Sequence, residues 1–134
     1  MPDAAGPGGE AGAAEVGAAI VEAINASDPA ALAALLDEGS EVATGRSVRK
    51  GPVEIGEWAA KEFDHLVRRY AIGEWRRSDD SALGVGSVQY VWSEGGDVAD
   101  SSPIAMIVSV SGDGRLDTLR VFDDIAAALG VFGD

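Results

Sequence analysis

The 134-residue chain carries 23 Asp and Glu against 10 Lys and Arg, a formal net charge of −13, and is 46% hydrophobic. This length suits one compact domain, and so acidic a surface repels nucleic-acid phosphates and anionic membranes, so we expect neither as a partner. Having no cysteine and one histidine, the chain lacks disulfides, thiolate metal sites and a cysteine nucleophile, and we expect no metal and no cofactor.

The N-terminus carries no targeting signal that we recognise. No apolar run reaches the roughly 18 to 20 residues of a membrane span, and the first residues lack the basic region of a signal peptide. Residues 1–12 are rich in Gly, Pro and Ala and are predicted to form a flexible tail before a single domain over residues 13–134. We therefore expect a cytoplasmic protein.

Helix signals dominate the first half of the domain. An apolar stripe at helical spacing ends near Ala26, and Asp28 with Pro29 then provides the N-cap and first residue of a second helix. Glu41–Val48 is expected to be a strand or an extended loop. Gly51-Pro52 begins a third predicted helix, whose inward face includes Ile55, Trp58, Ala59 and Phe63.

Strand signals follow His65. Turn residues separate four predicted strands, at Leu66–Arg77, Ala82–Trp92, Pro103–Val110 and Arg115–Phe122. A short helix is expected around Ile125–Leu129. The order predicts an α+β domain, with three N-terminal helices packed on one face of a curved antiparallel sheet. The pair Gly84 and Gly86 lacks the third glycine of a dinucleotide fingerprint and indicates sheet curvature or a bulge.

Basic residues concentrate in the middle of the chain. Residues 1–45 have eight acidic and no basic side chains, whereas Arg46 to Arg77 has eight basic and five acidic ones. An anionic ligand would therefore need this stretch. The arginines of the first long strand form either a rim for an anion or, as the simpler interpretation, a solvated strand protected by charge: Arg68, Arg69, Arg76 and Arg77.

Four local strings, in this order and spacing, resemble the NTF2-like superfamily, which includes ketosteroid isomerase, limonene-epoxide hydrolase and the SnoaL-like polyketide cyclases. They are the helix pair Glu22–Leu32, the helix start Lys50-Gly51-Pro52, the strand segment Val88–Trp92 and the closing segment Gly112–Asp124. The resemblance spans about residues 13–128. It implies a cone-shaped fold, a deep pocket between the concave face of the sheet and the helices, and often a homodimer through the convex face.

The acid and base positions of the family's known enzymes hold other residues here. The isomerase tyrosine, carboxylate base and acid correspond to Ile20, Thr44 and Met106, none of which can replace them. The segment Ser81–Ser93, where the resemblance places part of the carboxylate–arginine group of the epoxide hydrolases, contains no charged residue. We therefore expect this chain to catalyse neither reaction.

The pocket implied by the resemblance and by strand alternation is mostly apolar. Its polar candidates are Asp123 and Tyr90, and a desolvated Asp123 would act as a general acid or base; the simpler interpretation is that Asp123 is solvated or caps the last helix with Asp124. His65 either orients a substrate or, as we favour, satisfies backbone groups at the end of a helix. The expected lining is Ile20, Thr44, Trp58, Val88, Ile104, Met106, Val108, Leu119 and Val121.

Two hypotheses follow for function. The first is a SnoaL-like protein that binds a hydrophobic small molecule and catalyses a cyclisation or isomerisation of it; whether it is an enzyme stays open. The second is a non-catalytic NTF2-like module for dimerisation or partner binding. An open cavity with Asp123 in it would favour the first, and a cavity filled by Trp58 and Met106 the second. The half-apolar convex face, with Val85, Ile107 and Phe122, predicts a homodimer.

Overall fold

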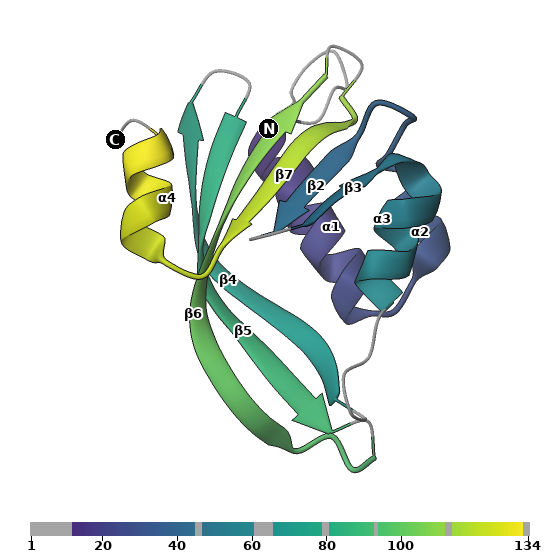
Figure 1. Cartoon of the computed structure of the whole chain (residues 1–134), viewed down its shortest axis with the longest axis vertical. Coiled ribbons are helices and arrows are strands. Elements are labelled where there is room, and N and C mark those ends of the chain that lie inside the picture. Colours follow the sequence, from purple (N-terminus) through teal and green to yellow (C-terminus); the bar gives the residue numbers. More distant parts are fainter. Residues whose placement is uncertain are drawn as a thin grey trace, which may run out of the picture.

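The computed structural model describes residues 12–44, 47–60, 66–78, 81–92, 94–111 and 114–132. Three helices gather beside one face of a strongly bent sheet, and a fourth lies against the other face (Figure 1). The elements in chain order are α1 (Ala13–Asn25), α2 (Pro29–Ala33), β2 (Glu41–Thr44), β3 (Ser47–Lys50), α3 (Gly51–Ala60), β4 (Leu66–Ser78), β5 (Ser81–Trp92), β6 (Val98–Val110), β7 (Leu116–Phe122) and α4 (Ile125–Phe132).

The sheet is mixed, where the sequence predicted an antiparallel one. Its strand order is β3-β2-β7-β6-β5-β4, and β2 runs parallel to β7, with Val42 opposite Leu119. The stretch Glu41–Val48, predicted as a strand or loop, lies in the β2–β3 hairpin. In chain order this hairpin stands between α2 and α3. The description of three N-terminal helices is not confirmed as such, because this hairpin, which pairs with β7, lies between α2 and α3 in the chain.

The predicted helix starts match the local geometry of the chain. Asp28 Oδ1 accepts a hydrogen bond from the Ala31 amide at 3.1 Å, and Pro29 is the first residue of α2. The cap satisfies one of the amides that a helix start leaves without an intrahelical partner. Apolar side chains on one side of α1 then pack against the sheet, among them Val16, Ile20 and Ile24.

The sheet bends where the two glycines of β5 allow close approach. The pairing of β4 with β5 shifts register between Ile72 and Glu74, opposite Gly86 and Val85. A Cβ on Gly86 would lie 2.0 Å from the carbonyl oxygen of Ala71. The bulge that the sequence indicated at the glycines therefore lies on the neighbouring strand, and Gly86 provides the space for it.

Two apolar clusters lie on opposite faces of the sheet. The larger one joins the concave face to α1, α2 and α3. The smaller one joins Leu83 and Ala105 to Ala128 of α4, and Val85, Ile107 and Phe122 pack against it. The chain's own last helix therefore covers apolar residues that the sequence assigned to a dimer contact. No helix among the described residues is both long and apolar enough to cross a membrane.

Candidate functional site

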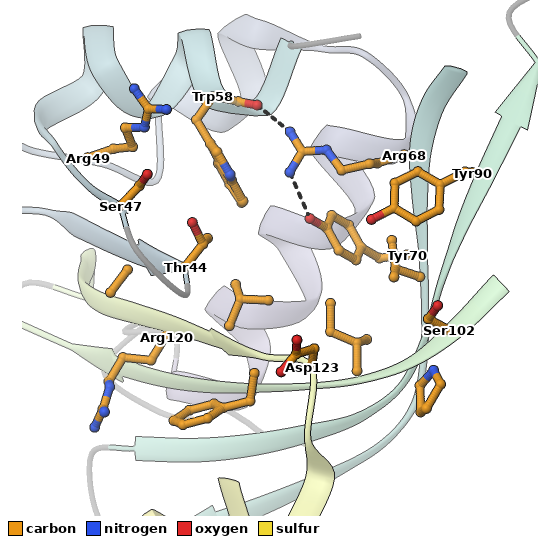
Figure 2. Close-up of a pocket in the computed structure, with 16 residues that line it drawn as sticks. Thr44, Ser47, Arg49, Trp58, Arg68, Tyr70, Tyr90, Ser102, Arg120 and Asp123 are labelled. Atoms are coloured by element: carbon orange, nitrogen blue, oxygen red, sulfur yellow. Dashed lines mark hydrogen bonds between the residues drawn. The ribbon is translucent and has the colours of Figure 1, made fainter. Parts of the chain in front are cut away.

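A cavity of about 740 Å³ opens between the concave side of the sheet, the β2–β3 hairpin and α3 (Figure 2). Its wall mixes apolar side chains with arginines, hydroxyl groups and a carboxylate, so it is less uniformly apolar than the sequence suggested. The lining residues are Ala43, Thr44, Ser47, Arg49, Trp58, Arg68, Tyr70, Val88, Tyr90, Ser102, Pro103, Ile104, Arg120, Val121, Phe122 and Asp123.

The expected lining residues separate into two groups. Thr44, Trp58, Val88, Ile104 and Val121 lie in the wall of the cavity. The other four are buried in the core and do not line it, because α1 packs directly over that part of the sheet: Ile20, Met106, Val108 and Leu119, which are at most 2% exposed. The cavity therefore lies beside the part of the sheet that α1 covers, nearer to the ends of the strands.

Arg68 connects β4 to α3 at the polar end of the cavity. Its Nη2 donates to the backbone carbonyl of Trp58, and its guanidinium lies 4.8 Å from the centre of the Trp58 indole ring. The carbonyl belongs to the last turn of α3, where backbone oxygens lack intrahelical partners and cations are favoured. Arg68 therefore both holds the end of α3 and presents its charge to the cavity (Figure 2).

Tyr70, two residues along β4, lies on the same side of the strand. Its phenol oxygen accepts a hydrogen bond from Arg68 Nη1 at 3.3 Å, and the residue is 4% exposed. Burial raises the pKa of the Tyr70 phenol above its usual value, although the nearby Arg68 charge opposes this. The phenol is therefore protonated at neutral pH and, with its oxygen already accepting, can donate its hydrogen to a ligand.

Asn25, the last residue of α1, fixes the backbone of Tyr70. Its Nδ2 donates to the Tyr70 carbonyl oxygen and its Oδ1 accepts from the Tyr70 amide, both at 2.8 Å. Because β4 is an edge strand of the sheet, these bonds take the place of those that a further strand would make. Asn25 thus sets where β4 presents the Tyr70 side chain.

The candidate catalytic residues have different placements. Asp123 lines the cavity at the end of β7 and is exposed, whereas Asp124 makes the capping bonds to α4, accepting from the amides of Ala126 and Ala127 at 3.0 and 3.3 Å. Tyr90, on β5, also lines the cavity and is partly buried. The third candidate, His65, lies outside the described residues.

Sequence reasoning missed Arg49 and Tyr70 and favoured the solvated alternative for Arg68. The alternation of Arg68, Tyr70 and Ile72 along β4 was the available signal, since these residues share one side of a strand. The other arginines of β4 are exposed and bond elsewhere: Arg69 to Gln89 at 3.4 Å, Arg76 to Glu74 at 2.9 Å and Arg77 to Glu15 at 2.5 Å. Within the described ranges, no group of three acidic or histidine side chains is placed to hold a metal ion.

No protein-family model and no curated protein matches this sequence. Solved structures do match its fold. An NTF2-like protein of unknown function from Cytophaga hutchinsonii has a TM-score of 0.69 at 11% identity, with 92% of this chain and 99% of that one covered. For a candidate polyketide cyclase from Sinorhizobium meliloti the TM-score is 0.67 at 17% identity, with coverage of 80% and 93%.

A Mycobacterium tuberculosis protein in complex with estradiol-17beta-hemisuccinate is similar as well, with a TM-score of 0.70 at 14% identity and coverage of 85% of this chain and 95% of that one. Together with the bent sheet and the helices on its concave side, these likenesses show that the chain has the NTF2-like fold.

Proposed function

We propose that this protein binds a small organic molecule with an apolar ring skeleton in the cavity described above. The observation that carries the proposal is the cavity itself: about 740 Å³, not filled by Trp58, with Asp123 in its wall. Ligand pockets for small molecules are commonly about 300 to 1,000 Å³, with apolar walls and a few directed polar groups. The binding of a steroid hemisuccinate by a protein of the same fold is in keeping with this proposal.

We further propose that the site catalyses a proton transfer within an isomerisation or cyclisation. The Asp123 carboxylate would take a proton from a carbon next to a ligand carbonyl. Tyr90 would donate a hydrogen bond to the carbonyl oxygen as negative charge develops on it. The proton on Asp123 would then return to another carbon of the same ligand, so that no co-reactant is required. Asp123 and Tyr90 line one cavity, which supports this assignment.

The test begins with a thermal-shift screen of polyketide-like and terpenoid-like compounds. A ligand present at one hundred times its Kd should stabilise the protein by about 2.7 kcal/mol, which such a screen detects. For each hit, turnover is then followed by NMR in the wild type and in Asp123→Asn and Tyr90→Phe. We expect both variants to lose turnover while keeping binding.

Asp117→Asn provides the matched control, because Asp117 is an exposed residue of β7, the strand that ends just before Asp123, and does not line the cavity. It should keep full turnover. Turnover that survives in Asp123→Asn would contradict the assignment of the base, and a screen without any hit would contradict the binding proposal itself.

A second function, a non-catalytic binding module, is favoured by one observation. Of the positions that correspond to the isomerase acids and base, Ile20 and Met106 are 2% and 1% exposed in the core, and Thr44 alone lines the cavity. Hits that bind tightly without turnover in the wild type would support this alternative. The homodimer stays a prediction; α4 covers part of the face predicted for it, and Val131 of α4 is 51% exposed.

A further inference from the structure

The cavity concentrates positive charge in an otherwise acidic protein. Arg49, Arg68 and Arg120 line it, and Asp123 is the single acidic side chain among the described lining residues. The whole chain has a formal net charge of −13. A small anion is therefore repelled by most of the surface and favoured at this one concave site, where low-dielectric walls strengthen the field of the arginines.

Arg49 lies in this wall, and one of its hydrogen-bond donors has no acceptor among the described residues. Its Nε is buried, and among the described residues it has no hydrogen-bond partner. A buried N–H group left in this state carries an unrecovered desolvation cost, so an acceptor brought by a ligand would recover part of that cost. Figure 2 shows Arg49 and Arg68 on either side of the Trp58 indole.

The neighbouring polar groups are donors as well. The phenol of Tyr70 accepts from Arg68 and so has its own hydrogen left to give, and burial keeps it protonated by raising its pKa. The hydroxyl groups of Thr44 and Ser47 lie near the same end of the cavity (Figure 2). A site rich in donors selects a ligand group that only accepts, and a carboxylate fits the planar fork of a guanidinium particularly well.

Arg120 is arranged differently from the other two arginines. Its guanidinium lies 5.1 Å from the centre of the Phe122 ring, the residue is exposed, and in Figure 2 it points away from the Trp58 end. The side chains of Val88, Ile104 and Val121 form part of the remaining wall. The cavity therefore has a cationic end with two arginines and an apolar portion.

We infer that the ligand of this cavity is an organic carboxylate, whose carboxylate group is bound by Arg49, Arg68 and Tyr70 and whose apolar skeleton packs on Val88, Ile104 and Val121. This inference rests on the proposed binding function and specifies its ligand class. It does not depend on whether the bound molecule is then transformed, because the recognition groups are distinct from Asp123.

The experiment compares carboxylic acids with their primary amides, which share shape and size but differ in charge. Suitable pairs are 2-naphthylacetate with 2-naphthylacetamide, and larger tricyclic and steroid acids with their amides, measured by isothermal titration calorimetry. We expect each acid that binds to do so at least tenfold more tightly than its amide, because hydrogen bonds to charged groups are stronger than neutral ones. Raising the salt concentration should weaken the binding of the acid and leave the binding of the amide unchanged.

Three substitutions locate the effect. Arg49→Gln and Arg68→Gln should each reduce the preference for the acid over its amide to threefold or less. Tyr70→Phe should weaken the binding of the acid about five- to tenfold. Arg69→Gln is the matched control, since it removes the same charge one residue away on β4, where Arg69 is exposed and bonds Gln89. Arg49→Gln gives an independent result if the loss of the Arg68 contact to Trp58 unfolds the protein.

Each outcome decides between the proposals. Acids preferred in the wild type and in Arg69→Gln, but not in Arg49→Gln, support the inference. Acids and amides that bind equally would overturn the carboxylate assignment and leave the binding function standing. If Arg69→Gln lowers the preference as much as Arg49→Gln, the effect is one of overall charge and the inference fails. If no member of any pair binds, the proposed function and the inference both fail.

Discussion

The contact between Asn25 and Tyr70 offers a direct test of how α1 fixes the cavity wall. Two hydrogen bonds of 2.8 Å join the Asn25 amide to the backbone of Tyr70. Replacing Asn25 by alanine removes both and leaves an amide and a carbonyl of an edge strand without these partners. At about 0.5 to 1.5 kcal/mol for each neutral hydrogen bond, the free energy of unfolding should fall by roughly 1 to 3 kcal/mol. Because Asn25 is itself exposed, water can reach the freed groups and the lower half of this range is expected.

Urea unfolding followed by tryptophan fluorescence, with linear extrapolation, measures this change. Asn25→Asp should not restore stability, because a carboxylate accepts from the Tyr70 amide but faces the Tyr70 carbonyl oxygen without a hydrogen to donate. Glu22→Ala, an exposed change on the same helix, is the control and should stay within about 0.5 kcal/mol. A loss below about 0.3 kcal/mol in Asn25→Ala, or full stability in Asn25→Asp, would refute the assigned geometry.

The remaining predictions concern close packing, pH and assembly. Gly86→Ala places a Cβ 2.0 Å from the Ala71 carbonyl oxygen. In urea unfolding it should destabilise the fold by about 1 to 3 kcal/mol. The control Gly56→Ala has open space around its Cβ in α3 and should be neutral or stabilising by up to about 1 kcal/mol. The hydrogen bond from Arg77 lowers the pKa of the Glu15 carboxyl below its ordinary value, so this pair stabilises the protein at neutral pH and the contribution is lost as acidification protonates Glu15. Arg77→Gln should therefore be less stable than the wild type by under about 1 kcal/mol at pH 7, a difference that shrinks in acid and in 0.5 M salt; a constant difference from pH 7 to pH 3 would contradict this. Sedimentation at micromolar concentration should show a homodimer, and a stable monomer would refute that prediction.

Much of the local structure follows from short-range chemistry. Asp28 and Pro29 specify the start of α2 because a side-chain oxygen and a missing amide suit only the first turn of a helix. The four long strands were predicted within a few residues of their ends, except that β6 begins at Val98 and not at Pro103. That strand extends through Asp100 and Ser101, which pair with Tyr90 and Gln89, so pairing with β5 overrides a polar local sequence.

The partition between core and cavity could not be read from strand alternation. Met106 and Ile104 lie on the same side of β6, yet Met106 is buried beneath the helices and Ile104 lines the cavity. The alternation of residues predicts which face of the strand a side chain lies on. It does not predict how far along that face α1 covers the strand. The same limit applies to Arg68, whose role depends on the end of α3 lying beside it, a contact between residues ten apart on separate elements.

The amino-acid sequence by itself determined the acidic character of the protein, the absence of cysteine chemistry, the helix starts and the α+β order of elements, because these depend on composition and on residues close together along the chain. Only the tertiary structure decided that β2 joins β7 in parallel, that α4 covers part of the convex face, and that Arg49, Arg68 and Tyr70 line one cavity. Those features arise from pairing between distant segments, where the burial of one element against another, and not local preference, selects the arrangement.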